Sequence, residues 1–220
     1  MKTKTLIKIV IDIAMTISLL LLMTYGLIGE DMHEYIGVAI FILFVLHHIL
    51  NKHWSKNLLK GKYTSIRILQ SILVIAMLLC MLGSMLSGVI LSRYVFHFDI
   101  KGMTMLARNI HMLCAYWGVV IMSLHLGLHW NIMIAIAKKH IKISSYFFVW
   151  IARTVVLIIS LYGVYAFIFR RVGRYMLLMD HFVFFNFNES VILFIADYLA
   201  IMITFVSIGY YGSKIIKGKK

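Results

Sequence analysis

The sequence predicts an all-α protein that crosses a membrane as a bundle of helices. Of its 220 residues, 62% are hydrophobic and only 14% are charged, and the mean hydropathy is +0.94. A soluble domain needs more polar side chains than this to cover its surface. Proline is absent, so the composition contains no strong helix breaker. These features exclude a water-soluble enzyme and place the activity of the chain in or at a lipid bilayer.

Six apolar runs are each long enough to cross a bilayer, which takes about 20 mostly apolar residues in a helix. The first run follows several lysines, but it is long and lacks a small-residue cleavage site, so we expect it to be retained as a helix. The connections are too short to fold alone. We therefore expect a polytopic six-helix bundle in the cell membrane. The runs cover residues 6–28, 34–51, 67–91, 109–133, 148–169 and 190–212.

Charged residues alternate between the two sides of the predicted bundle. Lysine and arginine gather at the N-terminus, in the second and fourth connections and in the C-terminal tail, whereas most acidic residues lie in the other connections. By the positive-inside rule, this distribution predicts that both termini are cytoplasmic. The formal charge of +14 is spread over short clusters between apolar runs. We therefore expect a lipid bilayer as the partner of these charges, and no nucleic acid.

The second and fourth runs share a histidine pattern. Residues 33–54 and 111–130 both begin with His, carry Leu-His fourteen residues later and close with His-Trp. Fourteen residues make about four helical turns and about 21 Å, so the two histidines of each helix lie on one stripe. Both helices run from outside to inside. Equivalent histidines of the two helices should therefore lie level with each other.

This arrangement predicts two facing histidine pairs inside the bundle. Ionisable residues in membrane helices are functional candidates, because burying them costs several kcal/mol. Two imidazoles that face each other across a bundle can bind haem iron from both sides. We therefore predict two b-type haems, bound non-covalently and stacked across the bilayer. The predicted ligands are His33 with His111 near the outer surface, and His47 with His125 in the inner half.

Residues near these histidines fit the same prediction. Gly37 and Gly118 follow within two turns of the outer histidines, where a missing side chain lets a porphyrin edge approach. Arg93 and Arg108 lie at the outer rim, where haem propionates need counter-charges. The two cysteines match neither a zinc spacing nor the motif for covalently attached haem.

Several alternatives stay open at this point. His48 and His129 compete as inner ligands; His125 and His129 have a spacing that suits zinc, but the glutamate of a zinc-protease motif is absent. His97, His140 and His181 are predicted to be surface residues in connections. Asp197 is expected to bond within the bundle, with a quinone-site role as the alternative. The segment 170–189 is expected to lie at the outer membrane interface or to dock an outer partner.

Three stretches together resemble the flavinylation-associated cytochrome family, formerly described as a domain of unknown function. It is similar in plan to the ferric reductase and cytochrome b membrane domains. These stretches are HEYIGVAIFILFVLHHILN from residue 33, LSRYVFHF from residue 91 and RNIHMLCAYWGVVIMSLHLGLHW from residue 108. The resemblance implies a di-haem four-helix core over residues 1–135, with two additional membrane helices and an outer interfacial segment in 136–220.

The resemblance also implies a function. The chain would pass electrons from the quinol pool or a cytoplasmic donor to an extracytoplasmic protein that carries covalently attached FMN. The sequence has no flavin-attachment motif, so FMN would belong to that partner. Whether the chain is a subunit of a quinol-dependent oxidoreductase stays open. The alternative is a non-redox membrane transporter or assembly subunit whose histidines bind a transition metal.

Overall fold

The computed structural model describes residues 3–58, 60–96, 102–140 and 146–218. Within these ranges every regular element is a helix, and six helices are long and apolar enough to span a membrane. The predicted all-α polytopic bundle is therefore confirmed. The six long helices are α1 (Thr3–Met23), α3 (Glu30–Leu50), α5 (Ser65–Leu91), α6 (Thr104–His140), α7 (Tyr146–Phe169) and α9 (Val191–Gly218).

Three short helices were not predicted from the sequence: α2 (Tyr25–Ile28), α4 (Lys52–Lys56) and α8 (Val172–Met176). The first apolar run divides into α1 and α2, because the chain turns at Thr24. Gly29 separates α2 from α3 with a φ of 94°, a conformation that glycine adopts without steric cost. Gly26 of α2 lies directly beneath the Phe185 ring, where a Cβ atom would clash. This glycine therefore lets the outer loop cover α2.

Helix α6 extends beyond the predicted run 109–133 at both ends. Because it continues to the end of the lysine cluster, His140 is the last residue of this helix. The prediction that His140 lies in a connection is therefore wrong. The side chain of His140 and the whole of His97 lie outside the described residues.

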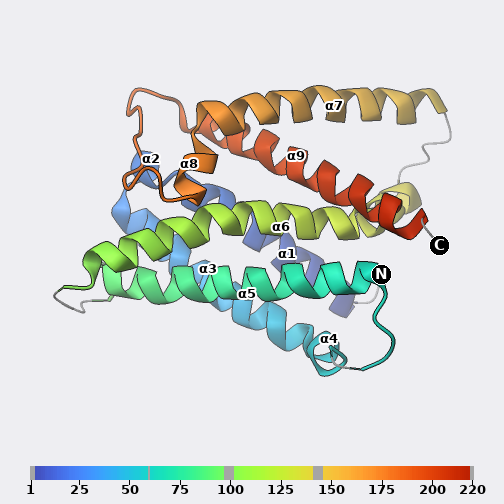
Figure 1. The fold of residues 1–220 in the computed structure, drawn as a ribbon, viewed down its shortest axis with the longest axis horizontal. Coiled ribbons are helices and arrows are strands. Elements are labelled where there is room, and N and C mark those ends of the chain that lie inside the picture. Colours follow the sequence, from blue (N-terminus) through green and yellow to red (C-terminus); the bar gives the residue numbers. More distant parts are fainter. Residues whose placement is uncertain (1–2, 59, 97–101, 141–145, 219–220) are drawn as a thin grey trace.

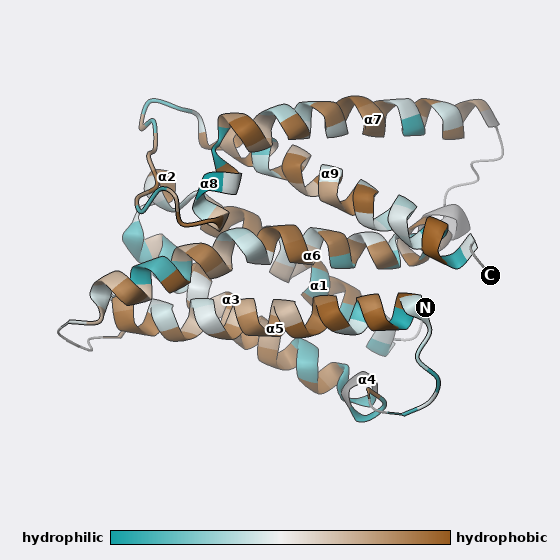
Figure 2. Ribbon diagram, in the orientation of Figure 1, coloured by the Kyte–Doolittle hydropathy of each residue, from teal (hydrophilic) through white to brown (hydrophobic). Residues whose placement is uncertain are grey.

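Helix α6 lies at the centre of the bundle, between α5 and α9 (Figure 1). Helix α7 packs on the side of α9 that faces away from α6 (Figure 1). Helix α1 contacts α3 and α9, and α3 contacts α5, so that α1, α3, α5, α6 and α9 close a ring. Both marked chain ends lie at the α4 end of the bundle, and α2 and α8 lie at the opposite end (Figure 1). Hydrophobic residues line the long helices between these ends (Figure 2).

The best-packed part of the molecule joins α6, α8 and α9. The rings of Tyr116 in α6 and Tyr175 in α8 stack with centroids 4.8 Å apart. Gly127 of α6 lies so close to α9 that a Cβ atom would collide with the Val206 carbonyl oxygen. This core also includes Met23 of α1, so it joins residues from both sides of the predicted boundary at residue 135.

Candidate functional site

His33 and His111, the predicted outer pair, meet across the bundle. Their ring centroids lie 5.9 Å apart, with an interplanar angle of 65°. They come from α3 and α6, which are not among the helix pairs whose backbones run close together over the described residues. The two helices are therefore bridged here by long polar side chains instead of by direct backbone packing.

The His111 ring is held in one orientation by α5. Its Nδ1 atom lies 3.0 Å from the Ser84 carbonyl oxygen and 3.1 Å from the Ser87 hydroxyl oxygen. The Ser87 hydroxyl donates to the Gly83 carbonyl oxygen at 2.5 Å, so the His111 Nδ1–H is the donor towards both oxygens. The opposite ring nitrogen, Nε2, then carries no proton and is able to bind a metal.

In the inner half, His47 is oriented by a residue of α1. Its Nδ1 atom lies 2.7 Å from Oδ1 of Asp12. Because the carboxylate oxygen accepts this hydrogen bond, Nδ1 carries the proton; Nε2 is unprotonated and lies 3.5 Å from the Asn51 amide nitrogen. Carboxylate–histidine pairs of this kind are usual behind metal-binding imidazoles.

His125 lies near this inner group, and its buried Nδ1 atom has no hydrogen-bond partner among the described residues. Its ring packs against His129 with centroids 4.9 Å apart, and it is within electrostatic range of His47 and Asp12. In the part of the chain that the structure describes, His47 has its ring contact with His48 and not with His125. The inner pair is thus less closely apposed than the outer pair.

The two pairs share one feature. In each pair, the Nδ1 atom of one imidazole has a hydrogen-bond partner; these imidazoles are His111 and His47. The other imidazole, His33 or His125, has a buried Nδ1 atom without a hydrogen-bond partner. Buried polar nitrogen atoms without partners are costly, and each such case calls for an explanation. An imidazole that binds a metal through one of its nitrogens is one explanation.

The competing inner ligands have partners of their own. The Nδ1 atom of His48 bonds to the Phe44 carbonyl oxygen of its own helix at 3.0 Å. The ring of His129 packs against that of His125, with centroids 4.9 Å apart. His181 is exposed, as predicted for a surface residue.

The two predicted glycines have different surroundings. A Cβ atom at Gly37 would meet no atom of the protein within 4 Å, so this face of α3 is open one turn below His33. A Cβ atom at Gly118 would lie 3.9 Å from Cβ of Cys80, so Gly118 faces α5. Gly88, which was not predicted as a site residue, lies directly beside the ring of His111. A Cβ atom added to Gly88 would lie 3.4 Å from Cε1 of His111.

The predicted arginines lie at the outer end with protein partners. Arg93 is 3.5 Å from Glu30, and its side chain is 70% exposed. Arg108 lies over the Phe182 ring, 5.3 Å from its centroid. Both side chains remain close to the rim of the outer pair, where they could pair with anionic groups.

Glu34, the neighbour of His33, ties α3 to the end of α5. Its carboxylate accepts hydrogen bonds from the Ser92 hydroxyl and from three consecutive backbone N–H groups, over distances of 2.6–3.0 Å. These N–H groups belong to Arg93, Tyr94 and Val95. The level of His33 relative to the α5–α6 pair is therefore set by a charged contact one residue away.

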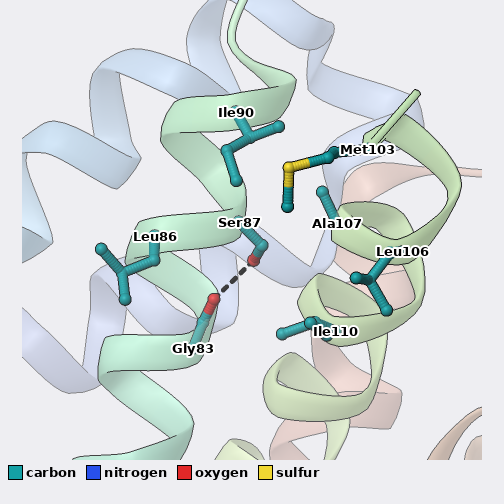
Figure 3. Close-up of a pocket in the computed structure, with 8 residues that line it drawn as sticks. All are labelled: Gly83, Leu86, Ser87, Ile90, Met103, Leu106, Ala107 and Ile110. Atoms are coloured by element: carbon teal, nitrogen blue, oxygen red, sulfur yellow. Dashed lines mark hydrogen bonds between the residues drawn. The ribbon is translucent and has the colours of Figure 1, made fainter. Parts of the chain in front are cut away.

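A pocket of about 230 Å³ lies between α5 and α6 (Figure 3). Its walls are mainly aliphatic side chains, and the Ser87 hydroxyl points to the Gly83 carbonyl oxygen. The pocket therefore offers no free polar group to orient a quinone headgroup. Its lining residues are Gly83, Leu86, Ser87, Ile90, Met103, Leu106, Ala107 and Ile110.

Asp197 bonds within the bundle, which confirms that prediction. It accepts hydrogen bonds from Arg170 Nε at 2.8 Å and from the Tyr162 hydroxyl at 2.5 Å. Arg170 also donates to Glu189 and lies over the Phe194 ring. This buried ion-pair network joins α7 to α9 far along the chain from the histidines, and we assign it a structural role.

The segment 170–189 is only partly interfacial. Val172, Tyr175 and Met176 of α8 are buried, and the Trp117 indole donates to the Met176 carbonyl oxygen at 2.9 Å. Phe184 and Phe187 are each 78% exposed. The buried side chains fasten this segment to the outer end of α6, and the exposed rings remain available to lipid.

Sequence reasoning missed the residues behind the histidines. Asp12 could have been singled out as a carboxylate in the middle of an apolar run. Ser84, Ser87 and Gly88 are small residues at helical spacing within a run rich in leucine and methionine, which marks the face of α5 that receives another helix. Asn109, whose buried Oδ1 has no hydrogen-bond partner, gave no signal in the sequence.

The donor set fits haem better at the outer pair than at the inner pair. Imidazoles are usual axial ligands of haem iron, and the outer pair has two facing rings, one oriented ring nitrogen and an open face at Gly37. The inner pair has an oriented His47 and a partnerless His125 Nδ1. Among the described residues, no group of three or more His, Cys, Asp or Glu side chains is placed to hold a bare metal ion.

Neither a family model, nor a curated protein, nor a solved structure matches this chain.

Proposed function

We propose that this chain is a transmembrane cytochrome that binds two b-type haems and carries electrons between the two sides of the membrane. The observation that carries the proposal is the outer pair. Two imidazoles face each other at 5.9 Å from helices whose backbones stay apart, and one of them has its Nδ1 atom engaged from behind. Structural histidines in a membrane bundle need only one partner each and have no reason to be duplicated at the same spacing on two helices.

Bound haems would supply one-electron carriers at two depths in the bilayer. The chain contributes their binding and surroundings. His33 and His111 would hold the outer group, and His47 and His125 the inner group. The carbonyl oxygen of Ser84 and the carboxylate of Asp12 keep the proton on Nδ1 of their histidines, which leaves Nε2 as the ligand.

The ends of the bundle suit electron exchange with different partners. The lysine-rich end with both termini would be cytoplasmic by the positive-inside rule, and there a cytoplasmic donor or a quinol would deliver electrons. The opposite end carries α2, α8 and the exposed aromatic rings of the 170–189 segment. We propose an extracytoplasmic FMN-bearing protein as the acceptor at this end.

The test is the haem content of single histidine variants. The chain is purified in detergent after expression with haem supplied, and haem is counted by the pyridine haemochrome method. We expect two haems in the unaltered protein. Each variant in the set H33A, H111A, H47A and H125A should retain about half, because loss of either imidazole of a pair would remove one of the two residues that would hold the same haem. H181A is the matched control, since His181 is exposed and distant from both pairs in the sequence.

The pattern among variants is the decisive result. H33A and H111A should give matching spectra, and H47A and H125A should give a second matching pair. Loss of haem in H129A with none in H125A would move the inner ligand by one helical turn. Absence of a Soret band in the unaltered protein would overturn the proposal and favour a metal-binding membrane protein without redox function.

A further inference from the structure

An intramembrane carboxylate makes the two proposed haem sites unequal. Asp12 lies in the middle of the first apolar span, and half of its side-chain surface, 52%, is not covered by protein. A charged group in this position is expensive and marks a functional residue by default. Its partner within hydrogen-bonding distance is Nδ1 of His47, at 2.7 Å.

A second polar contact fixes the register of α1 against α3. The Lys8 ammonium group donates to the Asn51 side-chain oxygen at 2.8 Å, one turn from Asp12 on α1 and one turn from His47 on α3. Asn51 also donates to the His47 carbonyl oxygen at 3.0 Å. The Lys8–Asn51 and Asp12–His47 contacts lie one helical turn apart and together keep the carboxylate level with the imidazole. The contact between Asp12 and His47 is therefore not an isolated surface ion pair.

The corresponding contact at the outer pair is electrically neutral. His111 Nδ1 faces a backbone carbonyl and a serine hydroxyl, whereas His47 Nδ1 faces a carboxylate. A carboxylate behind an imidazole makes the imidazole a stronger electron donor to a metal than a carbonyl does. A stronger donor favours the more oxidised metal and so lowers the reduction potential.

We propose that Asp12 is a positioning residue for His47 and that it lowers the reduction potential of the inner haem relative to the outer one. This inference rests on the proposed function. It adds a residue from α1 to the site, and it distinguishes the two haems by the charge behind one ligand.

The experiment is a redox titration of the purified holoprotein, followed by optical spectroscopy, for the unaltered chain and for D12N. Replacing the carboxylate by the neutral amide should shift the oxidised-to-reduced ratio of the inner haem about tenfold towards the reduced form. For a one-electron couple this equals a rise of about 59 mV. The outer haem should titrate at an unchanged potential and serves as an internal measure of correct folding.

Two further variants separate charge from structure. D12E keeps a carboxylate on α1 and should restore a potential close to that of the unaltered chain. D197N makes the same chemical change at the other intramembrane aspartate, which bonds to Arg170 and Tyr162, and should leave the inner potential unchanged. The inner haem is identified in the titration as the one that H47A lacks.

The outcomes distinguish this inference from the proposed function. If both proteins bind two haems and the inner haem has the same potential in D12N as in the unaltered protein, the role of Asp12 is overturned and the cytochrome proposal still stands. A shift of both potentials together in D12N, or the same shift in D197N, would also overturn it. An unaltered protein without haem would overturn both proposals.

Discussion

The contact between α6 and α9 and the contact between α6 and α3 are built in opposite ways. Between α6 and α9, Gly127 and Gly209 let the two backbones touch, and an added Cβ at Gly209 would lie 2.5 Å from the Leu124 carbonyl oxygen. Between α6 and α3, the backbones stay apart and the rings of His33 and His111 span the distance. Close packing of small residues stabilises a membrane bundle, but it leaves no room for a cofactor.

The difference teaches where this bundle is rigid and where it can hold a cofactor. Residues of α6, α8 and α9 supply most of the buried core, whereas in α3 only Ile40 and Phe44 are buried. The α3 side is held by polar contacts at its two ends, Glu34 to the end of α5 and Asp12 to His47. Tight packing on one face of α6 therefore supports an open, histidine-lined face on the other.

The largest expected effect comes from placing a leucine at a closely packed glycine of α6, compared with placing one at the open glycine of α3. G127L should destabilise the protein by more than about 3 kcal/mol, because its side chain would collide with the α9 backbone, which cannot move aside cheaply. G37L should change the stability by less than about 0.5 kcal/mol, because Gly37 faces open space. Thermal unfolding in detergent measures both.

Haem content sharpens this comparison. G37L should lower the occupancy of the outer haem, because its side chain would fill the open face one turn below His33. Equal stability losses in G127L and G37L would show that α3 packs as tightly as α9. Full haem content in G37L would show that this face does not approach a porphyrin.

A smaller effect is expected where a charged side chain ties α3 to the end of α5. E34A should remove the acceptor of four hydrogen bonds at the end of α5, at a cost of about 1–3 kcal/mol. It should also weaken outer haem binding, since Glu34 is next to His33. D31A is the matched control, because Asp31 lies in the same first turn of α3 and is exposed. Haem titration of the two variants should give weaker binding for E34A alone, and equal affinities would contradict the role of Glu34.

The smallest effect is expected at the outer segment after α7. Hydrogen bonds from Arg174 lower the pKa of Asp180 below its ordinary value of 3.8. A carboxylate with a depressed pKa in the folded state contributes stability above its ordinary pKa and loses it as the pH falls through the folded value. R174M should therefore lower the melting temperature slightly at neutral pH, and the difference should shrink as the pH falls below 3.8 and Asp180 takes up a proton. A difference that persists in acid would assign another role to Arg174.

Much of the candidate site follows from helix geometry. The fourteen-residue spacing of the histidines places His33 and His111 level as soon as two helices cross the bilayer in the same direction, and their rings do meet. The inner pair has the same spacing, yet His125 turns to His129 and His47 to Asp12. Spacing sets the depth of a residue, but its rotation towards a neighbour depends on the packing of the whole helix.

The sequence by itself determined the helical bundle and the places of the histidines along their helices, because the apolar runs and their helical period are local properties of the chain. Only the tertiary structure decided which residues stand behind the histidines. Asp12 reaches His47 from 35 positions away and Ser84 reaches His111 from 27 positions away. Such contacts depend on which helices become neighbours and at what register, and these are set by the glycine contacts of α9 and the charged contacts of α3, not by any local pattern.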